Sequence, residues 1–71
     1  MPKLYSSQHI VKVLEKKGFI FISQKGSHGK FRKEVYGKML TVIVPMGKKQ
    51  IPIGTFHSIR RQSNLQEEDF K

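Results

Sequence analysis

Apolar and polar residues follow two different periods along the chain, and these periods divide it into helices and strands. The segment Ile10–Leu14 has apolar residues at helical spacing. Either Ser6 or Ser7 can cap this helix, because a serine hydroxyl accepts a hydrogen bond from a free N–H of the first turn. Gly18 is expected to end the helix, since glycine readily adopts the left-handed conformation there.

Three extended segments follow this helix. Phe19–Lys25 is aromatic and β-branched, Lys30–Tyr36 alternates between apolar and polar residues, and Met39–Val44 is the most apolar. The glycines of Gly26–Gly29 predict a break between the first two. Pro45 is expected to end the third strand, because proline cannot donate to a strand ladder. Its apolar character predicts that the third strand is the central one.

A second helix is predicted over Phe56–Ser63, with Gly54–Thr55 as its cap and Asn64 in a left-handed closing position. Leu65–Phe70 can add a short final turn anchored by its two apolar ends. The order helix, three strands, helix predicts one α+β domain over residues 1–71. It is a two-layer sandwich whose two helices cover one face of an antiparallel three-stranded sheet. The other face stays in water.

The middle strand indicates what this open face carries. Phe31 and Val35 fall on one side of the alternation, and Lys30, Arg32 and Glu34 fall on the other. The sequence therefore predicts a charged open face.

The whole chain is small and strongly basic. It has 71 residues, 14 Lys and Arg against 5 Asp and Glu, and a net charge of +9. That size excludes two-domain cofactor folds. The charge predicts attraction to polyanions, nucleic acid first and an anionic membrane second. Acidic residues gather at the end of the chain, where Glu67–Asp69 form a run that suggests a solvated helix end or, less directly, an intramolecular shield for the basic body.

Several classes of protein are excluded by what the sequence lacks. It has no cysteine, so it can form neither a disulfide scaffold nor a cysteine-ligated zinc site. No apolar stretch approaches the length of a membrane span, and the first residues lack the apolar core of a signal peptide. We therefore expect a soluble, cytoplasmic protein without a membrane role.

Histidine is the side chain best suited to proton transfer near neutral pH. His9 and His57 each fall in the first turn of a predicted helix, where a surface, capping or partly buried role is expected. His28 instead falls in a predicted tight turn, and flanking glycines allow a phosphate backbone to approach the main chain closely. Four cations lie within five residues of it: Lys25, Lys30, Arg32 and Lys33.

A histidine among cations is what RNA cleavage requires. One group must remove the 2′-hydroxyl proton, and positive charge must stabilise the phosphorane. Other chemistries find less support, because the histidines and acids lack metal-ligand spacing and no glycine-rich phosphate loop is present. A Ser27–His28 nucleophile pair is weak, since adjacent residues at a strand end point apart. No metal or cofactor is expected.

Short segments over nearly the whole chain carry a family likeness. They are Gly18-Phe19, Gln24–His28, Phe31-Arg32, Thr41–Pro45, Ile53–Gln62 and Leu65–Phe70. Together they resemble the HicA toxin family of bacterial mRNA interferases. Three positions depart from the family pattern: His9 replaces an acid, Asn64 replaces a glycine, and Gln66 replaces a serine. The last departure predicts a poorly capped final helix.

The resemblance implies a fold similar to the double-stranded-RNA-binding domain and endoribonuclease activity on mRNA, with His28 as the catalytic residue. It also implies a HicB-type antitoxin that blocks the active face, and inhibition of translation when the toxin is released.

The leading hypothesis is therefore a metal-independent endoribonuclease. His28 acts as general base or as the acid of the second half of the reaction, and nearby residues bind RNA. The predicted RNA-binding residues are Lys25, Gly26, Ser27, Lys30, Arg32, Lys48 and Lys49.

Two alternatives remain open at the level of sequence. A non-catalytic RNA-binding module has the same element order and basic surplus, although the start of the second helix lacks a lysine cluster. A small ribonucleoprotein component without activity of its own is also compatible, but it gives the Gly26–His28 element no role.

Overall fold

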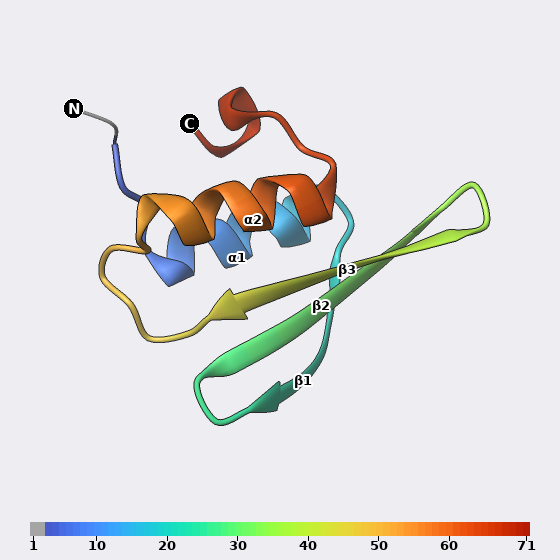
Figure 1. Ribbon diagram of the computed structural model, residues 1–71. Coiled ribbons are helices and arrows are strands. Elements are labelled where there is room, and N and C mark those ends of the chain that lie inside the picture. Colours follow the sequence, from blue (N-terminus) through green and yellow to red (C-terminus); the bar gives the residue numbers. More distant parts are fainter. Residues whose placement is uncertain (1–2) are drawn as a thin grey trace.

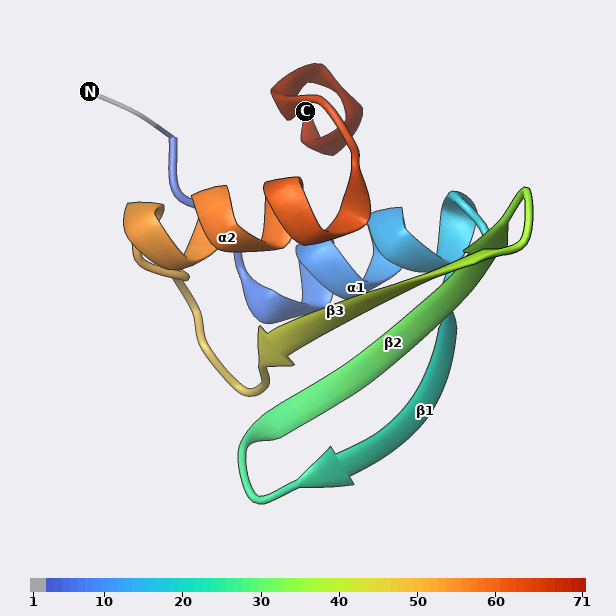
Figure 2. The ribbon, with the colours of Figure 1, turned by 45° about the vertical axis from the view of Figure 1, so that its right-hand side comes forward.

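The computed structural model describes residues 3–71, which form one sheet covered on one side by two helices (Figure 1). The elements are α1 (Ser7–Lys16), β1 (Ile20–Lys25), β2 (His28–Val35), β3 (Lys38–Pro45), α2 (Ile53–Ser63) and the 3₁₀ turn η1 (Glu67–Phe70). Figure 2 shows that both helices lie on the same face of the sheet. The predicted α+β sandwich and its element order are confirmed.

The strands form an antiparallel sheet in the order β1-β2-β3. The central strand is therefore β2, and the prediction that the third strand is central is wrong. Tight hairpin loops join each strand to the next, so the middle strand of the meander has a neighbour on both sides. The apolar character of β3 has a different cause, since Val42 and Val44 are fully buried in the core that the helices complete.

Both hairpin loops consist of two residues. Lys25 pairs with His28, so Gly26-Ser27 is the first loop, and Gly26 has a φ of +59°. A glycine with positive φ at the first loop position is the pattern of a type II′ turn. His28 is thus the first residue of β2 rather than part of a longer turn, which corrects the prediction that this strand begins at Lys30.

The ends of α1 agree with the sequence pattern. Ser6 is the N-cap, and its hydroxyl accepts a hydrogen bond from the His9 N–H at 3.1 Å. Gly18 follows the helix with a φ of +98°, a conformation that glycine adopts without steric penalty.

The start of α2 differs from the prediction. The helix begins at Ile53, so the predicted cap Gly54–Thr55 lies inside it. Pro52 is the N-cap residue and makes no side-chain capping bond; its carbonyl accepts the first helical hydrogen bond, from Phe56 at 2.9 Å. The closing residue is as predicted, since Asn64 is left-handed with a φ of +61°.

The C-terminal turn packs against α1 and α2. Phe70 is fully buried and meets the ring of Phe56 edge-on at 5.2 Å between centroids. The prediction of a poorly capped final turn holds for the Gln66 side chain, but the Asp69 carboxylate supplies one capping bond by accepting from the Gln66 N–H at 2.8 Å. The Gln66 side chain makes no capping hydrogen bond, and the Asp69 N–H donates instead to the Gln66 carbonyl oxygen at 3.0 Å.

Candidate functional site

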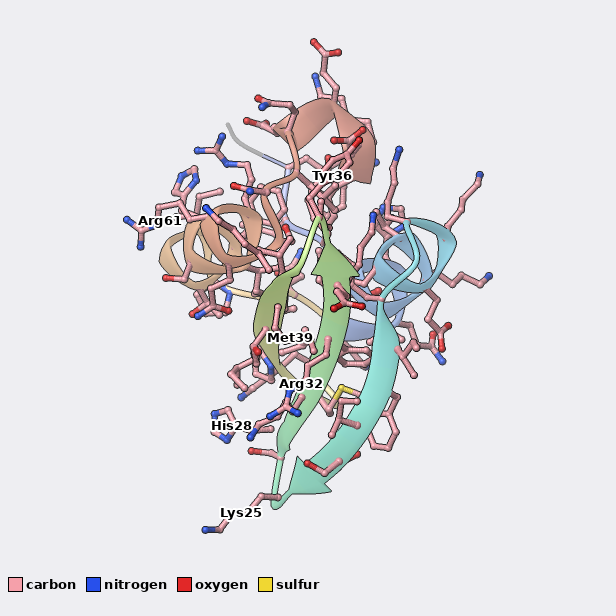
Figure 3. All side chains as sticks on the ribbon, turned by 90° about the vertical axis from the view of Figure 1, so that its right-hand side faces the viewer. Lys25, His28, Arg32, Tyr36, Met39 and Arg61 are labelled. Atoms are coloured by element: carbon pink, nitrogen blue, oxygen red, sulfur yellow. The ribbon has the colours of Figure 1, made fainter. Side chains whose placement is uncertain are left out.

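The open face of the sheet carries Lys30 and Arg32, two of the three Lys and Arg residues of β2. Gly29 and Phe31 are buried toward the helices. Because successive strand residues point to opposite faces, His28, Lys30 and Arg32 project from the other face. Figure 3 shows Met39, Arg32 and His28 following one another along the sheet, with Lys25 beyond them at the hairpin tip.

The pairing register gives His28 its immediate neighbours. It lies opposite Lys25 of β1 and Pro45 of β3, and Lys30 is two positions further along its own strand. Directly opposed residues share one face of a sheet, with Cα atoms about 5 Å apart. The strand rise separates residues i and i+2 by about 6.5 Å. The Cα atom of His28 thus lies about 5 Å from that of Lys25 and about 6.5 Å from that of Lys30, so a lysine neighbours the histidine in each of two directions.

The histidine ring is open to solvent. His28 is exposed, as are Gly26 and Ser27 beside it. The adjoining turn is closed by a hydrogen bond from Gln24 Nε2 to the Gly26 carbonyl oxygen at 3.0 Å. Within residues 3–71 no side-chain hydrogen bond involves the His28 ring, so both ring nitrogens are available to a ligand.

Other predicted cations lie elsewhere. Lys33 is one of the four cations close to His28 in sequence, but it is on the helix-facing side of β2, with its ammonium 5.8 Å from the centre of the Phe19 ring. Lys48 and Lys49 are exposed and line a hollow at the start of α1 together with Ser6 and other residues. They extend the basic surface around the end of the sheet toward the helix layer.

A groove on the open face was not foreseen from the sequence. It lies around Arg32, and its apolar walls include Ile20, Ile22 and Met39, which are 66%, 45% and 58% exposed. The register shifts between Phe21 and Ser23, so a bulge at Ile22 adds a second isoleucine to this wall. The run of apolar residues in β1 is the sequence feature that could have indicated this groove.

Arg32 lines this groove together with two other charged residues, Lys33 and Glu34. The Nε atom of Arg32 is buried and has no hydrogen-bond partner within residues 3–71. A buried donor without an acceptor is unfavourable.

The other two histidines belong to the helix layer. His9 stacks on Tyr5 with ring centroids 4.9 Å apart, and its Nε2 donates to the carbonyl oxygen of Phe70. His57 is exposed on α2. His28 is therefore the histidine of the open face. Across residues 3–71, no three His, Cys, Asp or Glu residues are grouped as a metal site would require.

Comparison with known families identifies the relationship of the chain. The family model described as the HicA toxin of bacterial toxin–antitoxin systems matches residues 7–65, from the start of α1 to just past α2. The chain belongs to the HicA toxin family. Membership in this family makes it the toxin of a toxin–antitoxin pair, with an antitoxin as partner. The comparison with curated proteins gave no match. Neither helix in the described part of this HicA toxin is long and apolar enough to cross a membrane.

Proposed function

We propose that this HicA toxin is a metal-independent endoribonuclease that cleaves mRNA in the cytoplasm and so blocks translation. One observation carries the proposal: an exposed histidine, His28, stands on the open sheet face between Lys25 and Lys30. These lysines supply the charge that holds phosphates, and the histidine supplies the group that moves a proton. Family membership gives the toxin role within which this chemistry acts.

The reaction uses the RNA's own 2′-hydroxyl as nucleophile. In this scheme His28 accepts the 2′-hydroxyl proton while water protonates the leaving 5′-oxygen, or His28 protonates the leaving 5′-oxygen while water accepts the 2′-hydroxyl proton. The 2′-oxygen bonds to phosphorus and the bond to the 5′-oxygen breaks, which leaves a 2′,3′-cyclic phosphate and a 5′-hydroxyl. Lys25 and Lys30 stabilise the negative charge that grows on the phosphorane oxygens. The exposed Gly26-Ser27 backbone allows the RNA strand to approach closely.

The RNA path extends beyond the cleaved bond. Arg32 lies two positions past Lys30 on the same face, where its positive charge would attract a further phosphate. In the other direction, exposed Lys48 and Lys49 continue the positive surface from the end of β3.

The partner is proposed to be a HicB-type antitoxin that binds the same open face. The groove around Arg32 combines exposed aliphatic side chains with the charged side chains of Arg32, Lys33 and Glu34, a composition typical of protein-binding surfaces. Because His28 lies on this face, a protein seated in the groove would also cover the histidine. The antitoxin would then inhibit the toxin by competing with RNA for this face.

Cleavage by purified protein tests the function. The parent, His28→Ala and His57→Ala are incubated with a single-stranded RNA in EDTA, and with the same strand carrying 2′-deoxyribose throughout. The parent and His57→Ala are expected to cut the RNA but not the 2′-deoxyribose strand. His28→Ala is expected to cut the RNA more slowly by about 100-fold or more. His57→Ala is the matched control, since it removes an exposed histidine from the helix layer.

The remaining outcomes separate the alternatives. If folded His28→Ala cuts RNA as fast as the parent, the catalytic assignment is wrong. If the parent binds RNA in a salt-sensitive manner but leaves it intact, the chain is a non-catalytic RNA-binding module.

A further inference from the structure

The loop that follows β3 contacts both residues that flank His28. The Met46 N–H donates to the Ser27 carbonyl oxygen at 2.5 Å. The Met46 side chain lies over Gly29, where its sulfur is 3.1 Å and its Cγ 3.2 Å from the position a Cβ would occupy. Through one backbone bond and one packing contact, Met46 fixes the chain on either side of the histidine.

Ser7 holds this loop against α1. The serine is 3% exposed, and its hydroxyl donates to the Pro45 carbonyl oxygen at 2.5 Å while accepting from the Lys48 N–H at 2.9 Å. Its own N–H donates to the Lys48 carbonyl oxygen at 2.9 Å. These bonds bracket Met46 on both sides. The first residue of α1 thereby fixes a loop that lies 38 residues away in sequence.

His28 depends on such support because little else holds it. It is the first paired residue after the β1–β2 loop, and ends of hairpins open more readily than their centres. No side-chain hydrogen bond within residues 3–71 orients its ring. The position of the ring relative to Lys30 is therefore set by the backbone of Ser27–Gly29.

We propose that Ser7 and Met46 are positioning residues for His28, acting through the loop between β3 and α2. This inference rests on the proposed ribonuclease function. Neither side chain contacts RNA in this scheme; together they keep the end of β2 in register, so that the imidazole and the lysines meet one phosphate. A misplacement of about 1 Å can slow an enzyme by about 100-fold, so a local loosening is sufficient to lower the rate.

Ser63 provides a matched control for Ser7. It is also a buried serine, 2% exposed, and its hydroxyl donates to the Arg60 carbonyl oxygen at 3.1 Å. That bond stays within α2 and reaches neither the loop nor β2. Ser7→Ala and Ser63→Ala therefore delete the same atom from two buried sites, and only the first site is connected to His28.

The experiment measures kcat and KM for RNA cleavage together with amide hydrogen exchange. For Ser7→Ala we expect kcat to fall by about 10-fold or more with KM changed less than about twofold, since ground-state phosphate contacts remain. The Met46 and Gly29 amides are expected to exchange faster. Ser63→Ala keeps parental kcat and parental exchange at these amides. Met46→Ala reproduces the Ser7→Ala loss, and Met46→Leu, which retains bulk over Gly29, restores most of the rate.

Two results would overturn the proposal. One is a Ser7→Ala variant with parental kcat and parental exchange at Met46 and Gly29. The other is an equal loss of kcat in Ser7→Ala and Ser63→Ala, which would mean that both serines act only through global stability. Failure of the nuclease assignment is recognised separately: His28→Ala would then retain the parental rate, and the exchange measurement would still decide whether Ser7 holds the hairpin.

Discussion

The sulfur of Met46 lies 3.1 Å from the position that a Cβ on Gly29 would occupy, and the nearest atom of the Phe31 ring lies 3.4 Å from it. A glycine is therefore favoured at position 29 because a larger side chain would collide with Met46. Its backbone conformation is not the reason, since its φ lies outside the left-handed region. Met46 covers the glycine so closely that a methyl group must displace the thioether.

Gly29→Ala is expected to destabilise the protein by about 1 kcal/mol, because the added methyl overpacks this contact. In the Met46→Ala background the same substitution is expected to be neutral or stabilising, since Ala restricts the unfolded chain more than Gly. Urea unfolding of the two single variants and the double variant measures the coupling between the sites. Additive effects would contradict the contact.

Tyr36 occupies the turn at the other end of β2, and its conformation is unfavourable for a tyrosine. It has a φ of +50° and Gly37 has a φ of +80°, the pattern of a type I′ turn, for which Asn-Gly is the preferred sequence. The Tyr36 side chain is fully exposed and so loses no packing when replaced.

Tyr36→Asn is expected to stabilise the protein by about 0.5–1 kcal/mol, and Tyr36→Val to destabilise it by a similar amount, since β-branched residues tolerate positive φ poorly. Chemical denaturation checks both. RNA cleavage is expected to stay at the parental rate, because this turn lies at the opposite end of β2 from His28 (Figure 3). Equal stability of the Asn and Val variants would mean that the positive φ at position 36 costs no free energy of folding.

Elements governed by local chemistry were predictable from the sequence. The serine cap and closing glycine of α1, the left-handed Asn64 and the charged open face of β2 all depend on residues close in sequence. Strand order depends instead on pairing, and the apolar richness of β3 indicated burial rather than a central position.

The surroundings of His28 were only partly predictable. Lys30 is its neighbour by alternation along the strand, but its pairing with Lys25 and its place at the start of β2 depend on a two-residue loop. Nor can a pair of adjacent serines reveal their separate roles: Ser6 caps α1, whereas Ser7 binds Pro45 and Lys48. Such long-range bonds are set by tertiary packing alone.

Asp69 makes the docking of η1 sensitive to acid. The hydrogen bond from the Gln66 N–H, and then that from Lys17, lower the pKa of Asp69 below its ordinary value of 3.8. Lys17 also forms an ion pair with this carboxylate at 3.3 Å. A lowered pKa in the folded state stabilises the fold above the unfolded value, and this contribution is lost as pH falls through the folded value.

Asp69→Asn is therefore expected to unfold more easily than the parent at pH 6, with the difference shrinking as pH falls below about 4. Urea midpoints across this range provide the measurement. Glu34→Gln is the control, because no ion pair of Glu34 is present within residues 3–71. A constant difference between parent and Asp69→Asn at every pH would show that the carboxylate charge has no part in docking η1.

The lysines beside His28 are expected to govern how salt weakens RNA binding. On a catalytically silent His28→Ala background, Lys30→Gln should reduce the slope of log K against log salt concentration by about 0.7, the value for one phosphate contact on a single strand. Lys25→Gln should do the same. Lys38→Gln removes the same charge from the far end of the hairpin, where Lys38 pairs with Val35 on the helix-facing side of the alternation. It is expected to leave the slope nearly unchanged. Equal effects of all three substitutions would mean that RNA responds to net charge alone, and the basic residues would then define no RNA path along the open face.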